Sequence, residues 1–75
     1  MKVTYDESVD AVYIYFVDEN ERNAFDYTYA CDPQVVDGQI HLDFDVDGHL
    51  IGIEVLQASK KLPHALLKNA IKLAV

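Results

Sequence analysis

Five residues in the middle of the chain have the types and spacing of a calcium-binding loop: Asp43, Asp45, Asp47, Gly48 and Glu54. This is the EF-hand pattern, in which carboxylates and nearby carbonyl groups wrap oxygen ligands around one ion. The pattern forms a site only where one helix enters the loop and another leaves it. Here the flanking residues alternate between apolar and polar types, which indicates strands. We therefore expect a solvated polar face that ends in a turn, with weak cation binding as the alternative.

A second set of side chains, His41, Asp43 and Glu54, is expected to gather on the polar face of those strands. Imidazole and carboxylate groups could hold a transition metal or exchange protons with a substrate. Catalysis needs a concave and partly dry site, however, and the face of an exposed hairpin is flat. A cross-strand charge pair between His41 and Glu54 is the simpler explanation. We assign no catalytic residues and expect no cofactor. A small-ligand or metal-binding protein that uses this face is the alternative function.

The single cysteine, Cys31, is directly followed by Asp32. A reactive thiolate needs nearby positive charge, so we expect an inert thiol that is at least half-buried. One cysteine cannot form an internal disulfide, which agrees with a reducing compartment. The chain also shows no secretory signal pattern and no apolar run of the roughly 18 residues that a membrane span needs. A cytoplasmic protein is therefore expected.

Residues 39–56 predict a β-hairpin centred on Asp47-Gly48. This dipeptide suits a two-residue type I′ turn, because both central positions of that turn need a positive φ. Val46 would then pair with His49. The apolar face receives Phe44 with Ile51, Leu42 with Ile53, and Ile40 with Val55. The polar face receives Asp45 with Leu50, Asp43 with Gly52, and His41 with Glu54.

Other strands are predicted at residues 2–5, 11–17 and 24–31. Residues 11–17 are apolar on both faces, so this strand should lie centrally or have its second face covered. Val35 and Val36 extend the third strand, and Asp37-Gly38 forms a second tight turn. After Pro63, apolar residues recur every three or four positions and predict one amphipathic helix of about three turns. The expected fold class is α+β: an antiparallel β-meander of four to five strands with a C-terminal amphipathic helix packed on one face, in a single small domain of residues 1–75.

Two segments carry a family resemblance: LDFDVDGHLIGIEVLQASKKLP at residues 42–63 and YDESVDAVYIYF at residues 5–16. The chain resembles a family of small prokaryotic proteins catalogued as domain of unknown function 2283. The shared features are an early Tyr-Asp, an Asp-Ala-hydrophobic-Tyr-Ile strand, an Asp-x-x-Gly turn leading to Gly-Ile-Glu, and a trailing Ala-Ser. The resemblance implies a small α+β domain and supplies no activity or catalytic residues. The resemblance also implies genes that often neighbour those of small toxin-like proteins, so an antitoxin-type role is one expectation.

Tyrosines supply the remaining candidate site. Tyr13 and Tyr15 share one face of a predicted strand, and Tyr27 and Tyr29 share one face of another. We predict that the four form a broad aromatic surface on the side without the helix. The alternative is that some of them only line the core. Exposed aromatic surfaces of this kind mark interfaces.

The net charge of -7 repels nucleic acid and anionic membranes, and it favours rapid capture of a basic protein. The favoured function is a non-enzymatic protein–protein interaction module. It would act as a homodimer or as an antitoxin-like partner of a small basic protein.

Overall fold

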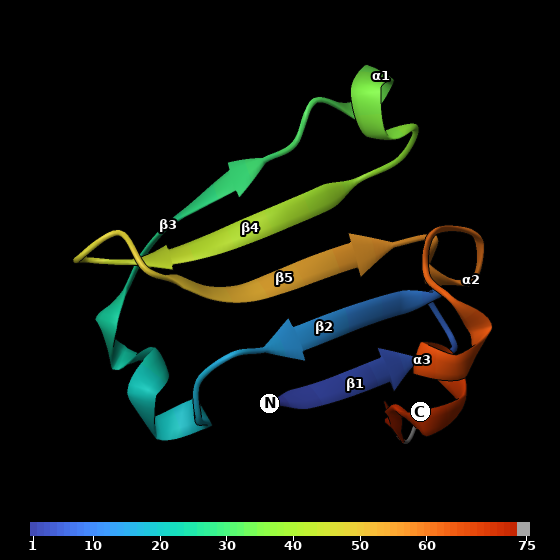
Figure 1. Cartoon of the computed structure of the whole chain (residues 1–75), viewed down its shortest axis with the longest axis horizontal. Coiled ribbons are helices and arrows are strands. Elements are labelled where there is room, and N and C mark those ends of the chain that lie inside the picture. Colours follow the sequence, from blue (N-terminus) through green and yellow to red (C-terminus); the bar gives the residue numbers. More distant parts are fainter. Residues whose placement is uncertain (74–75) are drawn as a thin grey trace.

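The computed structural model describes residues 1–73, apart from the side chains of Glu19, Arg22 and Asn23. It is an α+β structure with one six-stranded mixed sheet and several short helices (Figure 1). The strands are β1 Lys2–Asp6, β2 Ala11–Tyr15, β3 Phe25–Ala30, β4 Ile40–Asp45, β5 Leu50–Leu56 and β6 Ile71–Lys72. The helices are the 3-10 helix η1 Glu19–Ala24 and the α-helices α1 Pro33–Val36, α2 Ala58–Lys61 and α3 His64–Asn69.

The strands lie in the order β3-β4-β5-β2-β1-β6. The prediction of a single meander is therefore wrong. Strand β5 pairs with β2 and so connects two smaller units. These units are the β1–β2 hairpin and the β3–β4–β5 meander, and all of their pairings are antiparallel. The predicted central place of residues 11–17 is confirmed, although β2 ends at Tyr15.

The β4–β5 hairpin has the predicted register over most of its length. The confirmed pairs are Ile40–Val55, His41–Glu54, Leu42–Ile53 and Asp43–Gly52. An irregularity follows Asp43, so Phe44 lies opposite Leu50 and not opposite Ile51 as predicted. One extra residue on β5 produces this shift, as in a β-bulge.

The predicted two-residue turn at Asp47-Gly48 is also wrong. The Asp45 N–H donates to the His49 carbonyl at 2.9 Å, and the Gly48 N–H donates to the Asp45 carbonyl at 3.0 Å. Residues 46–48 therefore form a three-residue loop. Gly48 has a φ of 84°, while Asp47 is not among the residues with positive φ. A tight turn followed by one glycine in the left-handed region is the usual three-residue hairpin connection.

The segment between β3 and β4 is helical rather than extended. Asp32 caps α1 by accepting a hydrogen bond from the Gln34 N–H at 2.9 Å, and Pro33 fills the first turn, where its missing N–H costs little. Val35 and Val36 thus belong to α1 and do not extend β3 as predicted. Asp37 ends the helix in the left-handed conformation, with a φ of 52°.

The predicted three-turn C-terminal helix is wrong as well. The α3 helix ends at Asn69, and Ala70 is extended with a ψ of 154°. Ile71 then lies opposite Thr4 in the parallel β1–β6 pair, and the Leu73 N–H donates to the Tyr5 carbonyl at 3.0 Å. These contacts satisfy the outer edge of β1, and the β-branched Ile71 suits a strand. In residues 1–73 no helix has the length and apolar character that crossing a membrane requires.

The helices cover one part of one sheet face. Val12, Ala58 and Leu67 form the buried cluster there. Partly buried neighbours complete it: Val3, Tyr5, Ile14, Leu62 and Leu66. Figure 1 shows α2 and α3 near the ends of β1, β2 and β5, whereas no helix within residues 1–73 crosses β3 or β4 in this view. The core is thus concentrated in the β1–β2 half, and the β3–β4 half of the same face is left open.

Candidate functional site

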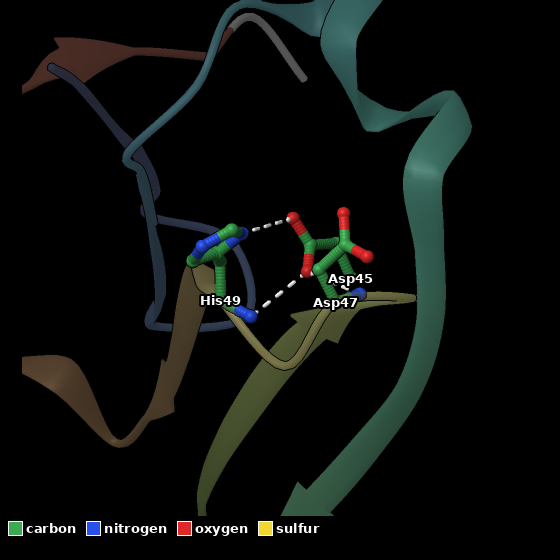
Figure 2. A group of neighbouring side chains, drawn as sticks. All are labelled: Asp45, Asp47 and His49. Carbon is green, nitrogen blue, oxygen red and sulfur yellow. Dashed lines mark hydrogen bonds and ion pairs between the residues drawn. The ribbon is translucent and has the colours of Figure 1, made fainter.

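The β4–β5 loop brings together three possible ligands: Asp45, Asp47 and His49. One ligand atom from each lies within 4.8 Å of the others. Asp47 and His49 are exposed, and Figure 2 shows the three side chains close together at the loop. The predicted metal ligands therefore do not converge on one point; they were His41, Asp43, Asp45, Asp47 and Glu54. Of these, only Asp45 and Asp47 belong to the observed group, and its third member, His49, was not predicted as a ligand.

The Asp45 carboxylate already accepts hydrogen bonds from residues of the loop. Its carboxylate accepts hydrogen bonds from the N–H groups of His49, at 2.8 Å, and Asp47, at 2.9 Å, and its second oxygen lies 3.1 Å from His49 Nδ1 (Figure 2). The His49 N–H, followed by the His49 ring, lowers the pKa of Asp45 below its usual value. The hydrogen bonds fix the turn, and a cation would have to compete with them. Strands enter and leave this loop, so the helical frame of an EF-hand is not formed.

His41 and Glu54 form the predicted cross-strand pair. They lie opposite each other on β4 and β5, with 2.8 Å between Nδ1 and Oε1. Both side chains are partly exposed, and the pair lies on the face of the sheet opposite α2 and α3. A hollow of about 260 Å³ beside Glu54 is lined by residues of β1 and β2, among them Thr4, Tyr13 and Tyr15. Among the described residues, His41, Asp43 and Glu54 do not form a group of possible metal ligands, because only Asp45, Asp47 and His49 bring their ligand atoms that close together.

Asp43 is buried, with 8% of its surface exposed, on the same face as the His41–Glu54 pair. It accepts hydrogen bonds from the Tyr13 hydroxyl of β2 and from Thr28 Oγ1 of β3, the latter at 2.6 Å. Three strands thus contribute one polar side chain each. Burial of a carboxylate is costly unless donors surround it, and these hydroxyls supply them. We call this group the Asp43 network.

Gly52 makes the Asp43 network possible. Tyr13 lies on β2 and Asp43 on β4, so the Tyr13 ring must cross β5 to reach it. A Cβ atom at position 52 would lie 2.6 Å from Cζ of Tyr13, which is far inside van der Waals contact. This network was not predicted from the sequence, although the predicted register placed Gly52 opposite Asp43. A glycine inside a strand is the signal, because it often marks the close approach of another group.

A second polar network joins the β1–β2 turn to α2. Asp10 accepts hydrogen bonds from the Tyr5 hydroxyl at 2.7 Å, the Ser59 hydroxyl at 2.6 Å and the Ser59 N–H at 3.0 Å. The Ala58 N–H donates to the Asp10 carbonyl at 2.9 Å. Asp10 therefore caps α2 from a distant loop, with its own backbone in the left-handed region at a φ of 54°.

These hydrogen bonds shift two pKa values in opposite directions. The Ser59 hydroxyl, and then the Tyr5 hydroxyl, lower the pKa of Asp10 because they stabilise its carboxylate. The same bond to Asp10 raises the pKa of Tyr5, because it holds the phenol proton. The network is thus arranged around an ionised Asp10 that ties two segments together.

The four tyrosines do not form one surface, which corrects the prediction. Tyr13 lies opposite Thr4 and Glu54, and Tyr15 lies on the same face. Tyr29 lies opposite Leu42 and Tyr27 opposite Phe44, on the other face of the sheet. The antiparallel register fixes this alternation, because successive residues of a strand point to opposite sides.

Tyr27 and Tyr29 instead belong to the open half of the helix-bearing face. Tyr27 stacks on Phe44 with 5.1 Å between ring centroids, and Tyr29 is 56% exposed. Half-buried apolar residues of β4 adjoin them. We call this surface the open patch, formed by Tyr27, Tyr29, Ile40, Leu42 and Phe44. Cys31, at the end of β3, is half-buried as expected.

The residues that carried the family resemblance occupy these networks. Tyr5, Asp10 and Ser59 form one, and Tyr13 and Gly52 belong to the other, while Asp45 and Gly48 shape the hairpin loop. The model of the family described as protein of unknown function (DUF2283) matches residues 2–59. A search of curated proteins and a search of solved structures each found no match. The matched range contains all of these residues, and it ends at Ser59.

Proposed function

We propose that this chain, which belongs to the family of proteins of unknown function DUF2283, acts by contacting another protein and not by catalysing a reaction. The open patch carries the proposal. It is a contiguous apolar surface on the same face as the core, and the helices stop short of it. Apolar and aromatic surfaces of this kind mark protein contacts, and tyrosine is among the residues enriched there.

The polar side chains support a non-enzymatic role. Asp43 and Asp10 are each held by hydroxyl donors, and His41 is paired with Glu54. These interactions give Asp43, Asp10 and His41 structural roles. Their arrangement is that of a scaffold which holds strands and α2 in place.

The small core gives the contact an energetic reason. A chain of 75 residues buries only about 60% of the surface that its unfolded form exposes. Five hydrophobic residues are buried within the described part of the chain: Val12, Ile51, Val55, Ala58 and Leu67. Covering the open patch would enlarge the buried apolar area on the same face.

A carboxylate in the open patch tests this proposal. Tyr29→Glu should abolish association, because the interface would have to bury a charge without a partner. Val9→Glu is the matched control, since Val9 is also exposed, at 64%, but lies in the β1–β2 turn. The measurements are sedimentation equilibrium for self-association and capture from an extract of the native host for other partners. Urea unfolding shows whether each variant remains folded.

Loss of association in Tyr29→Glu but not in Val9→Glu would support the proposal. It would be overturned by a wild-type chain that is monomeric at high micromolar concentration and captures nothing. Association that survives Tyr29→Glu unchanged would overturn the role of the open patch.

The distribution of charge favours a second form of the proposal, with a small basic protein as partner. All 13 acidic residues precede Gln57, and four of the six basic residues follow it: Lys60, Lys61, Lys68 and Lys72. The part of the chain before α2 is therefore strongly acidic, and this charge accelerates the encounter with a basic protein. A small basic protein that is captured from the host and released by salt would support this antitoxin-like form. A cytoplasmic location belongs to the same proposal, supported by the single free cysteine.

A further inference from the structure

We infer that the free edge of β3 pairs with β3 of a second copy of this chain, in antiparallel orientation about a two-fold axis at Thr28. This inference rests on the proposed function, and it names the partner and the mode of contact. It would join two six-stranded sheets into one continuous sheet.

From Tyr27 to Ala30, the outer edge of β3 has no protection within the described part of the chain. The strand pairs with β4 on one side, and it forms the end of the sheet on the other. All six of its residues are exposed. Natural edge strands are usually blocked by lysine, proline, a bulge or short length. Residues 25–30 contain no lysine or proline, and the irregularity in the β3–β4 register lies at the start of the strand, between Phe25 and Tyr27.

The opposite edge of the sheet provides a contrast. There β1 is covered by β6, a strand of two residues that includes Lys72. A short strand with a lysine is an ordinary means of blocking further pairing. Self-association by edge pairing is therefore directed to β3.

The hydrogen-bond pattern shows which backbone groups of β3 are free to pair. The Cys31 N–H donates to the Ile40 carbonyl at 2.9 Å. In an antiparallel pair, every second residue points its N–H and C=O groups toward the neighbour. The register then turns the backbone groups of Tyr29 toward β4 and those of Thr28 and Ala30 away from it. Thr28 and Ala30 thus offer N–H and C=O groups to a further strand.

The sequence of β3 is nearly symmetric about Thr28. A two-fold axis there places Thr28 opposite Thr28 of the second copy, and Tyr27 opposite Tyr29. Aromatic residues opposite each other stabilise antiparallel pairs. The tyrosines lie on the face of the open patch, so the two open patches become continuous across the axis.

Electrostatic repulsion between the two copies favours both this strand and this register. Each copy carries a net charge of -7, so two copies repel each other except where acidic residues are few. The β3 strand has one charged residue, Asp26. The Thr28 axis places Asp26, the residue at the β3 irregularity, next to Ala30 of the second copy, which separates the two Asp26 carboxylates. An axis at Asp26 would place like charges directly opposite each other, which is unfavourable.

Two substitutions at Ala30 test the register through the sign of their effects. Ala30→Lys would place an ammonium group opposite Asp26 of the second copy, and Ala30→Asp would place a carboxylate there. Each contact occurs twice, so the dimer dissociation constant should fall about 2- to 30-fold with lysine and rise about 2- to 30-fold with aspartate. Sedimentation equilibrium measures both, and urea unfolding of the diluted monomers corrects for any effect within the chain, where Ala30 faces His41.

Opposite effects at Ala30 that exceed those of the matched controls Val9→Lys and Val9→Asp would confirm the Thr28-centred pairing, because the controls report the general effect of net charge on association. If Tyr29→Glu abolishes self-association while Ala30→Lys and Ala30→Asp behave alike, the open patch makes the contact without edge pairing. The inference then fails, and the proposed function stands. A monomeric wild type would overturn the second copy as the partner, and capture of another protein through the open patch would leave the proposed function in place.

Discussion

Replacing Gly52 with alanine should break the hydrogen bond between Tyr13 and Asp43. The new Cβ would lie 2.6 Å from Cζ and 2.7 Å from Cε1 of Tyr13, so the ring must swing away from β5. A hydrogen bond to a carboxylate contributes about 1.5–3 kcal/mol. Removing a glycine from the interior of a strand returns about 0.5–1 kcal/mol. The free energy of unfolding should therefore fall by roughly 0.5–2.5 kcal/mol.

A double-mutant cycle with Tyr13→Ala isolates the cause. Once the ring is absent, Gly52→Ala meets no obstacle, so it should be neutral or stabilising in that background. Urea unfolding of the four proteins gives the coupling free energy from the midpoints, provided that the slope is unchanged. Equal destabilisation by Gly52→Ala in both backgrounds would refute the claim that the Tyr13 ring needs a glycine at position 52 to cross β5.

Three further predictions concern the turns and their carboxylates. The hydroxyls of Ser59 and Tyr5 lower the pKa of Asp10, so its contribution to stability is present above the unfolded pKa and is lost as pH falls through the folded pKa. Asp10→Asn should therefore be less stable at pH 7 and lose less stability than the wild type below about pH 4, and superimposable stability curves against pH would contradict this. Gly48→Val should destabilise the chain by more than about 1 kcal/mol, because Gly48 has a φ of 84°, whereas Asp47→Ala should change the urea midpoint little. Calcium should not bind more tightly than about 10 μM, because Asp45 already accepts two backbone N–H groups, and a tighter site in titration calorimetry would contradict that account.

Local patterns predicted the centre of the sheet. Alternation between residues 40 and 55 was sufficient for the pairs from Ile40–Val55 to Asp43–Gly52, because a slip of one residue would reverse the faces. The end of the hairpin escaped prediction. Asp47-Gly48 fits both a two-residue and a three-residue loop, and the choice depends on the bulge after Asp43 and on the hydrogen bonds of Asp45.

Long-range pairing explains the remaining differences. The spacing of apolar residues after Pro63 is helical, but the outer edge of β1 provides hydrogen bonds that draw Ile71 into a strand. Likewise, the faces of Tyr27 and Tyr29 depend on the β3–β4 register, and alternation within β3 alone does not determine which face is which. The network of Asp10 and Ser59 joins residues 49 positions apart, and neither residue carries a local signal of the other.

Hydrogen exchange at the edge of β3 tests the central claim, contact with another copy through this half of the sheet, most directly. The amides of Thr28 and Ala30 point away from β4, so their exchange should slow as protein concentration rises from low to high micromolar. The Tyr29 amide, which faces β4, should be protected at every concentration and serves as the internal control. Fast exchange of Thr28 and Ala30 at all concentrations, in a chain that sedimentation shows to be monomeric, would contradict this claim.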